Sequence, residues 1–195
     1  MNKNYQLAKA ALNDHQVIAF PTETVFGLGV YFDDEEAYEL LNKIKRRKED
    51  KPYTLMLHDV RQIKNYAYIK ETQLKGLSKF MPGPLTILLK CQDNVPSYVT
   101  HGTGIIGIRI PENKEALELL KYLDKPLLVP SANRADGKPA MNDEEVKKIF
   151  NDEIAVIIPG QAVGGLPSTI IDLTKEEITL IRQGPISLEE IKKAL

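Results

Sequence analysis

The sequence predicts a single α/β domain, residues 1–195, in which helices flank one twisted, mixed β-sheet. Short runs rich in branched apolar residues recur along the chain, and helical patterns lie between several of them. Helices dominate the first half and strands crowd the second, an order that favours one mixed sheet with helices packed on it. The length of 195 residues, with 43% apolar and 27% charged residues, is ordinary for one soluble globular domain.

Two helices are expected in the first quarter of the chain. Residues 2–13 carry apolar side chains at helical spacing and lead directly into the apolar run 17–20. Residues 33–52 open with four acidic residues and end in a basic cluster, which is the polarity that a helix dipole favours. We expect Pro52 to end this helix, because proline cannot continue it.

The later helices are marked by capping residues. Asn142 stands in front of the helical stretch 143–150 as an N-cap, and Ser187 with Glu190 has the spacing of a capping box at the start of the last helix. Further helical segments begin at Asp59, Thr72 and Asn113. Strands are expected at residues 17–20, 54–57, 85–89, 104–110, 126–130, 154–158, 169–173 and 178–182.

Composition excludes several classes of protein. The net charge of -1 provides no global basic field for nucleic acid. The single cysteine, Cys91, excludes an internal disulfide framework and a cysteine-based zinc cluster, and it fits a reducing compartment; we expect it to be a small buried residue. No apolar run approaches the ~18 residues of a membrane span, and no secretion signal opens the chain. We therefore expect a cytoplasmic protein without membrane contact.

Two familiar motifs do not apply. GTGIIG at residues 102–107 matches a dinucleotide fingerprint, but a strand that ends in proline follows it instead of a helix. No Walker loop is present. The three histidines, His15, His58 and His101, lack the spacing of metal ligands, so we expect no bound metal.

Polar clusters at the ends of strands and helices remain. The first places Thr22 and Thr24 before Gly27 and Gly29, where hydroxyls and free N–H groups can hold a carboxylate and the glycines allow it to approach closely. A turn that caps a helix would explain the same residues. A second loop carries Ser131 and, two positions on, an asparagine, where a simple turn is the alternative.

The other clusters supply cations and further hydroxyls. Lys45, Arg47 and Lys51 lie at the end of a helix, and taken alone they favour a solvated helix end that matches the dipole. Arg109 alternates with isoleucines; facing inward it would need an anion, and facing outward it would not. Arg182 ends the last predicted strand.

Taken together, these clusters provide cations, hydroxyls and glycine-rich approaches, with no acidic group or histidine that must act as a base. A site of this kind holds a polyanion and positions it. Phosphoryl or nucleotidyl transfer depends on such alignment and charge neutralisation, with a magnesium ion carried on the phosphates.

Read in order, eight short motifs resemble the threonylcarbamoyl-AMP synthase family, the YrdC-like enzymes, in its short single-domain form. The resemblance runs from about residue 7 to 187 and implies a twisted α/β sheet with a concave, positively charged cleft. It also implies a reaction in which L-threonine, bicarbonate or CO2, and ATP give threonylcarbamoyl-AMP and pyrophosphate. The motifs are PTETVFGLG, Lys45-Arg46-Arg47, Lys51-Pro52, PGPLT, IGIRIP, PSAN, LPSTIID and IRQG.

The resemblance further implies roles for individual residues. Lys45 and Arg47 would be catalytic, Arg109 would face the carboxylate of threonine as a bidentate fork, and Mg²⁺ would arrive with ATP. The implied ATP-binding residues are Lys45, Arg47, Lys51, Ser131, Asn133 and Arg182. The implied threonine-binding residues are Thr22, Thr24, Arg109 and Ser168. Partners would be the proteins that transfer the threonylcarbamoyl group onto tRNA, with weak binding of tRNA itself.

The chain departs from the family pattern in places. Lys48 stands where relatives usually have proline, and Phe26 replaces the usual tyrosine of the first motif. Met56 occupies a position where some relatives carry histidine, and His58, two residues on, shares that face of a regular strand. We assign no role in the site to Met56, His58 or Asn142.

Two other functions stay open at this point. An RNA-binding module could use the basic segment 45–51, although the net charge and the lack of interleaved aromatic residues argue against it. A carbamoyl-adenylating enzyme of the hydrogenase-maturation type would use carbamoyl phosphate in place of threonine and bicarbonate. The chain carries no zinc-finger or acylphosphatase segment of the kind expected with that activity.

Overall fold

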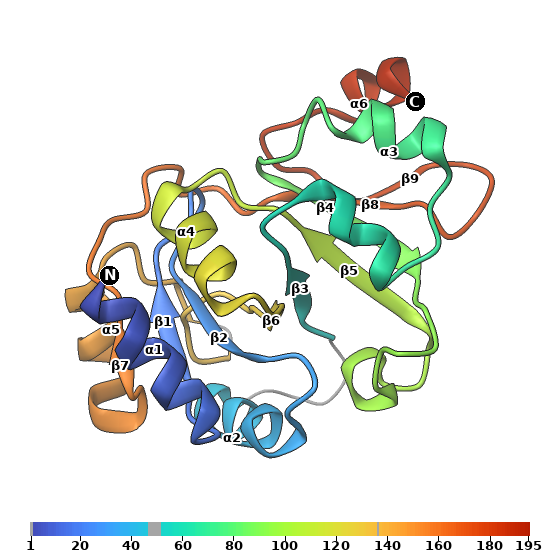
Figure 1. Ribbon diagram of the computed structural model, residues 1–195. Helices are drawn as coiled ribbons and strands as arrows, with labels where there is room; N and C mark the ends of the chain where they lie inside the picture. Colours follow the sequence, from blue (N-terminus) through green and yellow to red (C-terminus); the bar gives the residue numbers. More distant parts are fainter. Residues whose placement is uncertain (1, 47–51, 136) are drawn as a thin grey trace.

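The computed structural model describes residues 2–46, 52–135 and 137–195. Helices pack against a mixed β-sheet, and the two ends of the chain lie at opposite ends of the molecule (Figure 1). The strands are β1 (Ile18–Phe20), β2 (Gly27–Tyr31), β3 (Thr54–Met56), β4 (Leu85–Lys90), β5 (Ile105–Arg109), β6 (Leu127–Leu128), β7 (Val156–Ile157), β8 (Thr169–Asp172) and β9 (Thr179–Arg182). The α-helices are α1 (Lys3–Asn13), α2 (Glu35–Lys45), α3 (Glu71–Leu77), α4 (Lys114–Leu123), α5 (Asp143–Phe150) and α6 (Leu188–Ala194).

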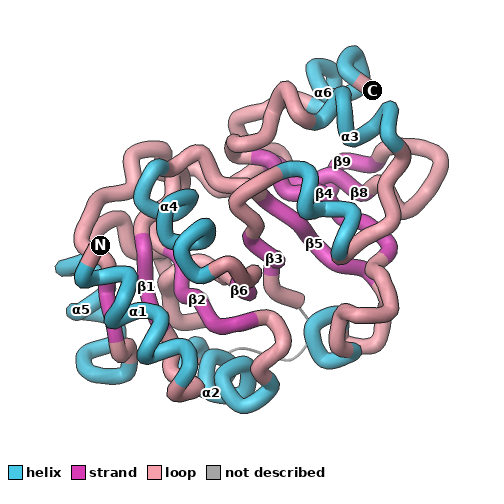
Figure 2. Tube along the Cα trace, in the orientation of Figure 1, coloured by secondary structure: helices cyan, strands magenta, loops and turns pink. Residues whose placement is uncertain are grey.

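The strands form one sheet in the order β7-β1-β2-β6-β3-β5-β4-β8-β9. Figure 2 shows the strands in magenta and the helices in cyan. The pairs β1–β7, β3–β5 and β4–β8 are parallel, and the other neighbouring pairs are antiparallel. Three short 3₁₀ helices, η1 (Val60–Asn65), η2 (Ser97–Thr100) and η3 (Asn151–Glu153), lie in the connections. The predicted α/β fold with a mixed sheet flanked by helices is confirmed.

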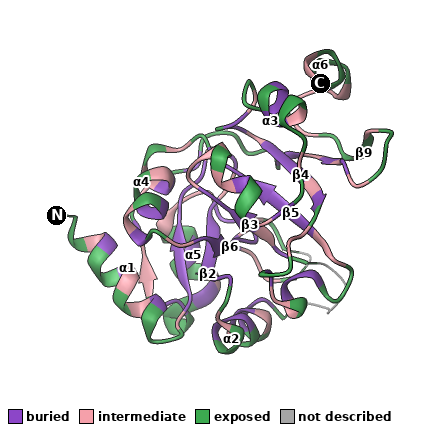
Figure 3. Ribbon diagram, turned by 45° about the vertical axis from the view of Figure 1, so that its right-hand side comes forward, coloured by how far each residue is buried: buried purple, intermediate pink, exposed green. Residues whose placement is uncertain are grey.

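The two faces of β1 belong to two separate parts of the core, because successive side chains of a strand point to opposite faces. Ile18 and Phe20 pack with residues of α1 and α4, whereas Val17 and Ala19 pack with residues of α2 and α5. Both sets are fully buried, and Figure 3 shows the buried colour concentrated on the strands between the helices.

Strand β2 is absent from the expectations above, where Gly27 and Gly29 were taken for ligand approach. Glycine is disfavoured in strands, so the two glycines obscure the strand pattern in the sequence. The packing around them nevertheless requires glycine at both positions. A Cβ on Gly27 would lie 2.5 Å from Val129 Cγ1, and one on Gly29 would lie 2.9 Å from Phe20 Cε1. Gly29 therefore serves the core and not a ligand.

Helix α2 ends earlier than predicted. Asp34 caps its start by accepting a hydrogen bond from Ala37 N (3.1 Å), as the acidic opening indicates. The helix stops at Lys45, because Arg46 adopts a left-handed conformation with φ of 52° that closes the last turn. The prediction that the helix ends at Pro52 was therefore wrong. Residues 47–51, between Arg46 and Pro52, lie outside the part of the chain that the structure describes.

Most other predicted helices are present. Asn142 caps α5 through Glu145 N (2.8 Å), and Ser187 with Glu190 forms the capping box of α6. The segment from Asp59 is the 3₁₀ helix η1 and not an α-helix. Cys91 is half-buried at the end of β4, so it is less enclosed than expected. Within the described ranges, no helix has both the length and the apolar character that crossing a membrane requires.

Candidate functional site

A cavity of about 630 Å³ opens against the sheet face formed by β3, β4, β5 and β8. Along β3 and β4, Thr54, Met56 and Thr86 face the cavity, while the intervening Leu55 and Ile87 are buried in the core. The period of two thus divides each strand between core and cavity. The volume falls within the roughly 300–1,000 Å³ typical of small-molecule sites.

The loop between β1 and β2 forms one wall of this cavity. Thr22 and Thr24 are both buried and line it. Their hydroxyl oxygens lie 3.0 Å apart, and Thr22 Oγ1 also donates to the carbonyl oxygen of Val25 (2.7 Å). The hydroxyls therefore stabilise the loop and also face the space that a ligand would occupy.

Arg109 lies at the end of β5 with its side chain 10% exposed, and it lines the cavity. Its Nη2 donates to Glu23 Oε1 and to Thr24 Oγ1, each at 2.8 Å. The outward-facing alternative for Arg109 is thus wrong, and the anion that an inward-facing arginine needs is supplied by the protein itself. Among the described residues, Glu23 Oε2 and Arg109 Nε are buried without a hydrogen-bond partner, so the pair is only half satisfied.

The opposite wall carries Ser168, which precedes β8. The parallel register of β4 and β8 pairs Thr86 with Ile170, and it brings Ser168 Oγ to 2.8 Å from Thr86 Oγ1. Arg182, at the end of β9, donates through Nε to the Ser168 carbonyl (3.0 Å) and through Nη2 to its hydroxyl (3.1 Å). All three polar side chains line the cavity.

The guanidinium groups of Arg109 and Arg182 therefore both line the cavity, and the carboxylate of Glu23 pairs with Arg109. Burial lowers the pKa of Arg182, and the nearby charge of Arg109 lowers it further. These three groups carry a net charge of +1, which suits one additional carboxylate or phosphate oxygen.

The glycine-rich segment 160–165 closes over the first loop. Gly164 N donates to the Glu23 carbonyl (2.9 Å), and Gly165 N donates to the Thr24 carbonyl (3.0 Å). A Cβ on Gly164 would lie 2.5 Å from the Glu23 oxygen, and Gly165 has a positive φ of 65°. Both positions therefore require glycine for the two loops to meet at the rim of the cavity.

Lys45, Ser131 and Asn133 meet where the end of α2 contacts the loop after β6, and of these three Ser131 lines the cavity while Lys45 and Asn133 do not. Lys45 is buried, and its Nζ donates to the carbonyl oxygens of Ser131 (2.6 Å) and Asn133 (2.7 Å). Ser131 Oγ donates to Asn133 Oδ1 (2.6 Å), and Ser131 lines the cavity. The structure thus brings three of the predicted ATP-binding residues together; Arg47 and Lys51 lie outside the described residues.

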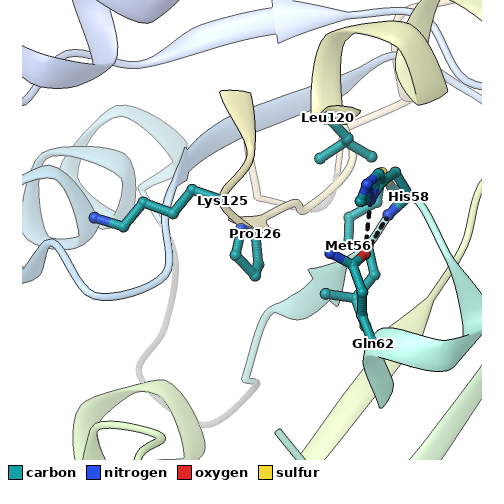
Figure 4. A pocket seen from close by; sticks show the side chains of 7 residues that line it. Met56, His58, Gln62, Leu120, Lys125 and Pro126 are labelled. Carbon is teal, nitrogen blue, oxygen red and sulfur yellow. Dashed lines mark hydrogen bonds between the residues drawn. The ribbon is translucent and has the colours of Figure 1, made fainter. Parts of the chain in front are cut away.

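The residues without an assigned role are also placed. Met56 lines the main cavity, but His58 does not. His58 lies with Gln62, Leu120 and Pro126 around a small hollow with about 0 Å³ of free volume (Figure 4). Its Nδ1 is 2.8 Å from Gln62 Oε1, and burial lowers its pKa. No trio of His, Cys, Asp or Glu suited to a metal ion occurs in residues 2–46, 52–135 and 137–195.

Sequence reasoning missed two polar residues of this site. Glu23 lies between Thr22 and Thr24 in the motif PTETVFGLG, and the sequence analysis assigned it no role, although a carboxylate is the usual partner for a buried arginine. Thr86 stands in the motif PGPLT, and its alternation with Leu85 and Ile87 places it on the face away from the core. Pairing between distant strands then brings Thr86 to Ser168.

Comparison with known proteins gives consistent matches over nearly the whole chain. The family model named Sua5/YciO/YrdC, with the description "Telomere recombination", matches residues 10–184. The threonylcarbamoyl-AMP synthase of Pyrococcus abyssi is 35% identical over 193 residues, which cover 97% of this chain and 56% of that protein. The threonylcarbamoyl-AMP synthase of Enterobacter sp. is 34% identical over 194 residues, which cover 94% of this chain and 100% of that protein.

The fold agrees with a solved structure of a protein from P. abyssi. The crystal structure of P. abyssi Sua5 complexed with L-threonine matches with a TM-score of 0.92 and 33% identity, over 98% of this chain and 57% of that one. This chain therefore spans about half the length of that relative, and 56% of the Bacillus subtilis threonylcarbamoyl-AMP synthase.

Proposed function

The chain belongs to the Sua5/YciO/YrdC family, and from this premise we propose that it is an L-threonylcarbamoyladenylate synthase. In this proposal it makes threonylcarbamoyl-AMP and pyrophosphate from L-threonine, bicarbonate or CO2, and MgATP, in the cytoplasm. Other proteins then transfer the threonylcarbamoyl group to an adenosine of tRNA, and tRNA itself binds weakly. One observation carries the proposal: a single cavity of about 630 Å³ gathers hydroxyls and arginines from widely separated segments.

The amino acid would bind between the two polar walls. Arg109 would pair with its carboxylate, since one guanidinium presents more donors than Glu23 and Thr24 accept here. Ser168, with Thr22 and Thr24, would hold the remaining polar groups. A fixed set of hydroxyls favours a substrate that hydrogen-bonds to them, because an apolar analogue would leave them unpaired.

The nucleotide would lie toward Ser131 and Asn133, with its phosphates near Lys45, Arg47, Lys51 and Arg182. The magnesium ion supplies charge neutralisation on the phosphates and arrives with them as part of the substrate. The residues of this chain align the reacting groups and oppose negative charge on the α-phosphate, as electrostatic catalysis requires.

The reaction would proceed in two steps. The neutral amine of threonine forms a bond to the carbon of CO2, which gives a carbamate and releases a proton. A carbamate oxygen then attacks the α-phosphorus of ATP, and the bond to pyrophosphate breaks. The product is the mixed anhydride threonylcarbamoyl-AMP.

The test is release of pyrophosphate from MgATP and bicarbonate with each amino acid in turn. We expect release that requires both threonine and bicarbonate, and Arg47→Ala should lower it about a hundredfold because a cation of the phosphate clamp is lost. Release with carbamoyl phosphate alone would indicate the hydrogenase-maturation type of reaction. Salt-dependent RNA binding without nucleotide binding would indicate an RNA-binding module.

A further inference from the structure

Arg134 has no role in the reaction proposed above, yet its guanidinium contacts three elements, α2, α5 and η3. Nη1 donates to the carbonyl oxygen of Ile44 in the last turn of α2, and the guanidinium pairs with the carboxylate of Glu153 in η3. Nη2 also lies 3.4 Å from the Ile149 carbonyl, and the guanidinium carbon is 4.9 Å from the centre of the Phe150 ring in α5. The hydrogen bond to Arg134 lowers the pKa of Glu153.

The end of α2 and the loop after β6 hold each other through hydrogen bonds in both directions. From the helix, Lys45 Nζ donates to the carbonyls of Ser131 and Asn133 at 2.6 and 2.7 Å. From the loop, Ala135 N donates to the Lys45 carbonyl at 2.9 Å, and Arg134 donates to the Ile44 carbonyl. The last carbonyls of a helix lack partners within it, so the loop supplies these partners.

We propose that Arg134 is a positioning residue for nucleotide binding. It fixes the end of α2, and with it Lys45, against the Ser131–Asn133 loop, and it anchors that loop to α5 and η3. Arg134 does not line the cavity itself, so it would act on a ligand only through neighbours such as Ser131, which does. That this ligand is a nucleotide rests on the proposed function. Without Arg134, the Ile44 carbonyl loses its donor and the loop loses its attachment to Glu153.

A purely structural role would be a simpler explanation, so the test separates position from stability. Arg134→Met keeps an apolar stem over Phe150 but removes every donor. Lys125→Met is the matched control: Lys125 pairs with Asp33 at 2.8 Å, lies 4.7 Å from the centre of the Tyr31 ring, and does not line the main cavity. Both variants remove one cation that is paired with a carboxylate and stacked on an aromatic ring.

Three measurements are made on wild type and both variants: dissociation constants of a non-hydrolysable ATP analogue with Mg²⁺, KM for threonine, and hydrogen exchange of residues 131–135. For Arg134→Met we expect nucleotide binding about tenfold weaker, a threonine KM within about twofold of wild type, and faster exchange in the loop. For Lys125→Met we expect wild-type values of all three.

The inference is overturned if Arg134→Met has wild-type hydrogen exchange in residues 131–135 and wild-type nucleotide affinity. It is also overturned if Lys125→Met loses as much nucleotide affinity as Arg134→Met. If Arg134→Met does not fold, Glu153→Gln is measured in its place, because this variant weakens the ion pair with Arg134 and keeps the hydrogen bond from Arg134 to the Ile44 carbonyl. A smaller loss of nucleotide affinity with faster loop exchange then supports the inference. Wild-type affinity and exchange in Glu153→Gln overturn it. A wild-type protein that binds no nucleotide contradicts the proposed function. Faster loop exchange in Arg134→Met would then support only the structural part of the inference.

Discussion

The pair formed by Arg109 and Glu23 shows at the scale of single residues why this cavity suits an anion. Both side chains are at least four-fifths buried, at 10% and 16% exposure, and they meet through one oxygen and one nitrogen at 2.8 Å. Glu23 pairs with only one nitrogen of Arg109 and leaves Arg109 Nε without a partner, and in the part of the chain that the structure describes no carboxylate pairs with Arg182. A ligand carboxylate can then bind without leaving a buried charge unpaired.

A double-mutant cycle tests this arrangement. Arg109→Met should lower the free energy of unfolding by about 3 kcal/mol, because the carboxylate of Glu23 is left buried without a partner. Arg109→Met combined with Glu23→Gln should recover most of that loss, but not threonine-dependent pyrophosphate release. Urea denaturation of the four proteins measures the first effect. A stable Arg109→Met protein would show that the pair is solvated in solution.

His15 provides a pH-dependent contact at the start of α2. Its Nδ1 lies 2.9 Å from Asp34 Oδ2, and this hydrogen bond raises its pKa, with smaller contributions from Glu36 and Asp14. A raised folded-state pKa means that the contribution to stability is full below the unfolded pKa of about 6.5 and is lost as the pH rises through the folded value.

We therefore expect the difference in unfolding free energy between wild type and His15→Gln to shrink as the pH rises above about 6.5. Denaturation at a series of pH values measures it, and proton NMR of the imidazole follows the titration directly. Because His58 has a lowered pKa and acts in the opposite sense, only the difference between the two proteins is informative. A difference that does not change with pH would contradict the contact.

At the scale of elements, the caps and the basic end of α2 show how local sequence determines local structure. Asn142 at α5 and Ser187 at α6 are caps that the sequence predicts and the structure confirms, because each acts on backbone groups within a few residues. The end of α2 also depends on a local feature, the left-handed Arg46, but arginine is not a typical residue there. The prediction from Pro52, which is a stronger helix-ending signal than arginine, therefore placed the end of the helix too late.

The cap of α5 gives an element-scale prediction. Asn142→Ala should lower the free energy of unfolding by about 1 kcal/mol, because Glu145 N loses its acceptor. Asn142→Ser should retain most of the stability, since a serine hydroxyl also accepts from Glu145 N and places no second carboxylate beside Glu145 Oε1, which lies 3.3 Å from Asn142 Nδ2. Thermal and urea denaturation measure both. If both variants keep full stability, the cap contributes nothing to folding.

At the scale of the whole molecule, the cavity exists because strands distant in sequence are neighbours in the sheet. The order β3-β5-β4-β8-β9 brings Thr54, Arg109, Thr86 and Arg182 onto one face. In the proposed function, separate parts of this cavity would contact threonine and the nucleotide. Ligands that bind the folded state stabilise it by mass action.

Ligand binding should therefore raise the stability of the whole protein. At a concentration of about 100 times its dissociation constant, a non-hydrolysable MgATP analogue should raise the free energy of unfolding by about 2.7 kcal/mol. Threonine should add to this effect in wild type. In Arg109→Met the nucleotide effect should remain and the threonine effect should disappear. Thermal unfolding with each ligand measures the shifts, and equal loss of both effects would contradict separate subsites.

The sequence by itself determined the helices with clear caps, most of the strands, the mixed α/β class and the residue types of the site, because these depend on periodicity and on neighbours along the chain. Only the tertiary structure decided that β2 is a strand, that Glu23 pairs with Arg109, that Thr86 reaches Ser168 and that Arg134 holds the end of α2. Each of these depends on contact between segments far apart in the sequence, and on side-chain volumes such as those that Gly27 and Gly29 must avoid. Local sequence patterns do not specify which distant segments will be in contact. The order and register of the strands in the sheet determine these contacts.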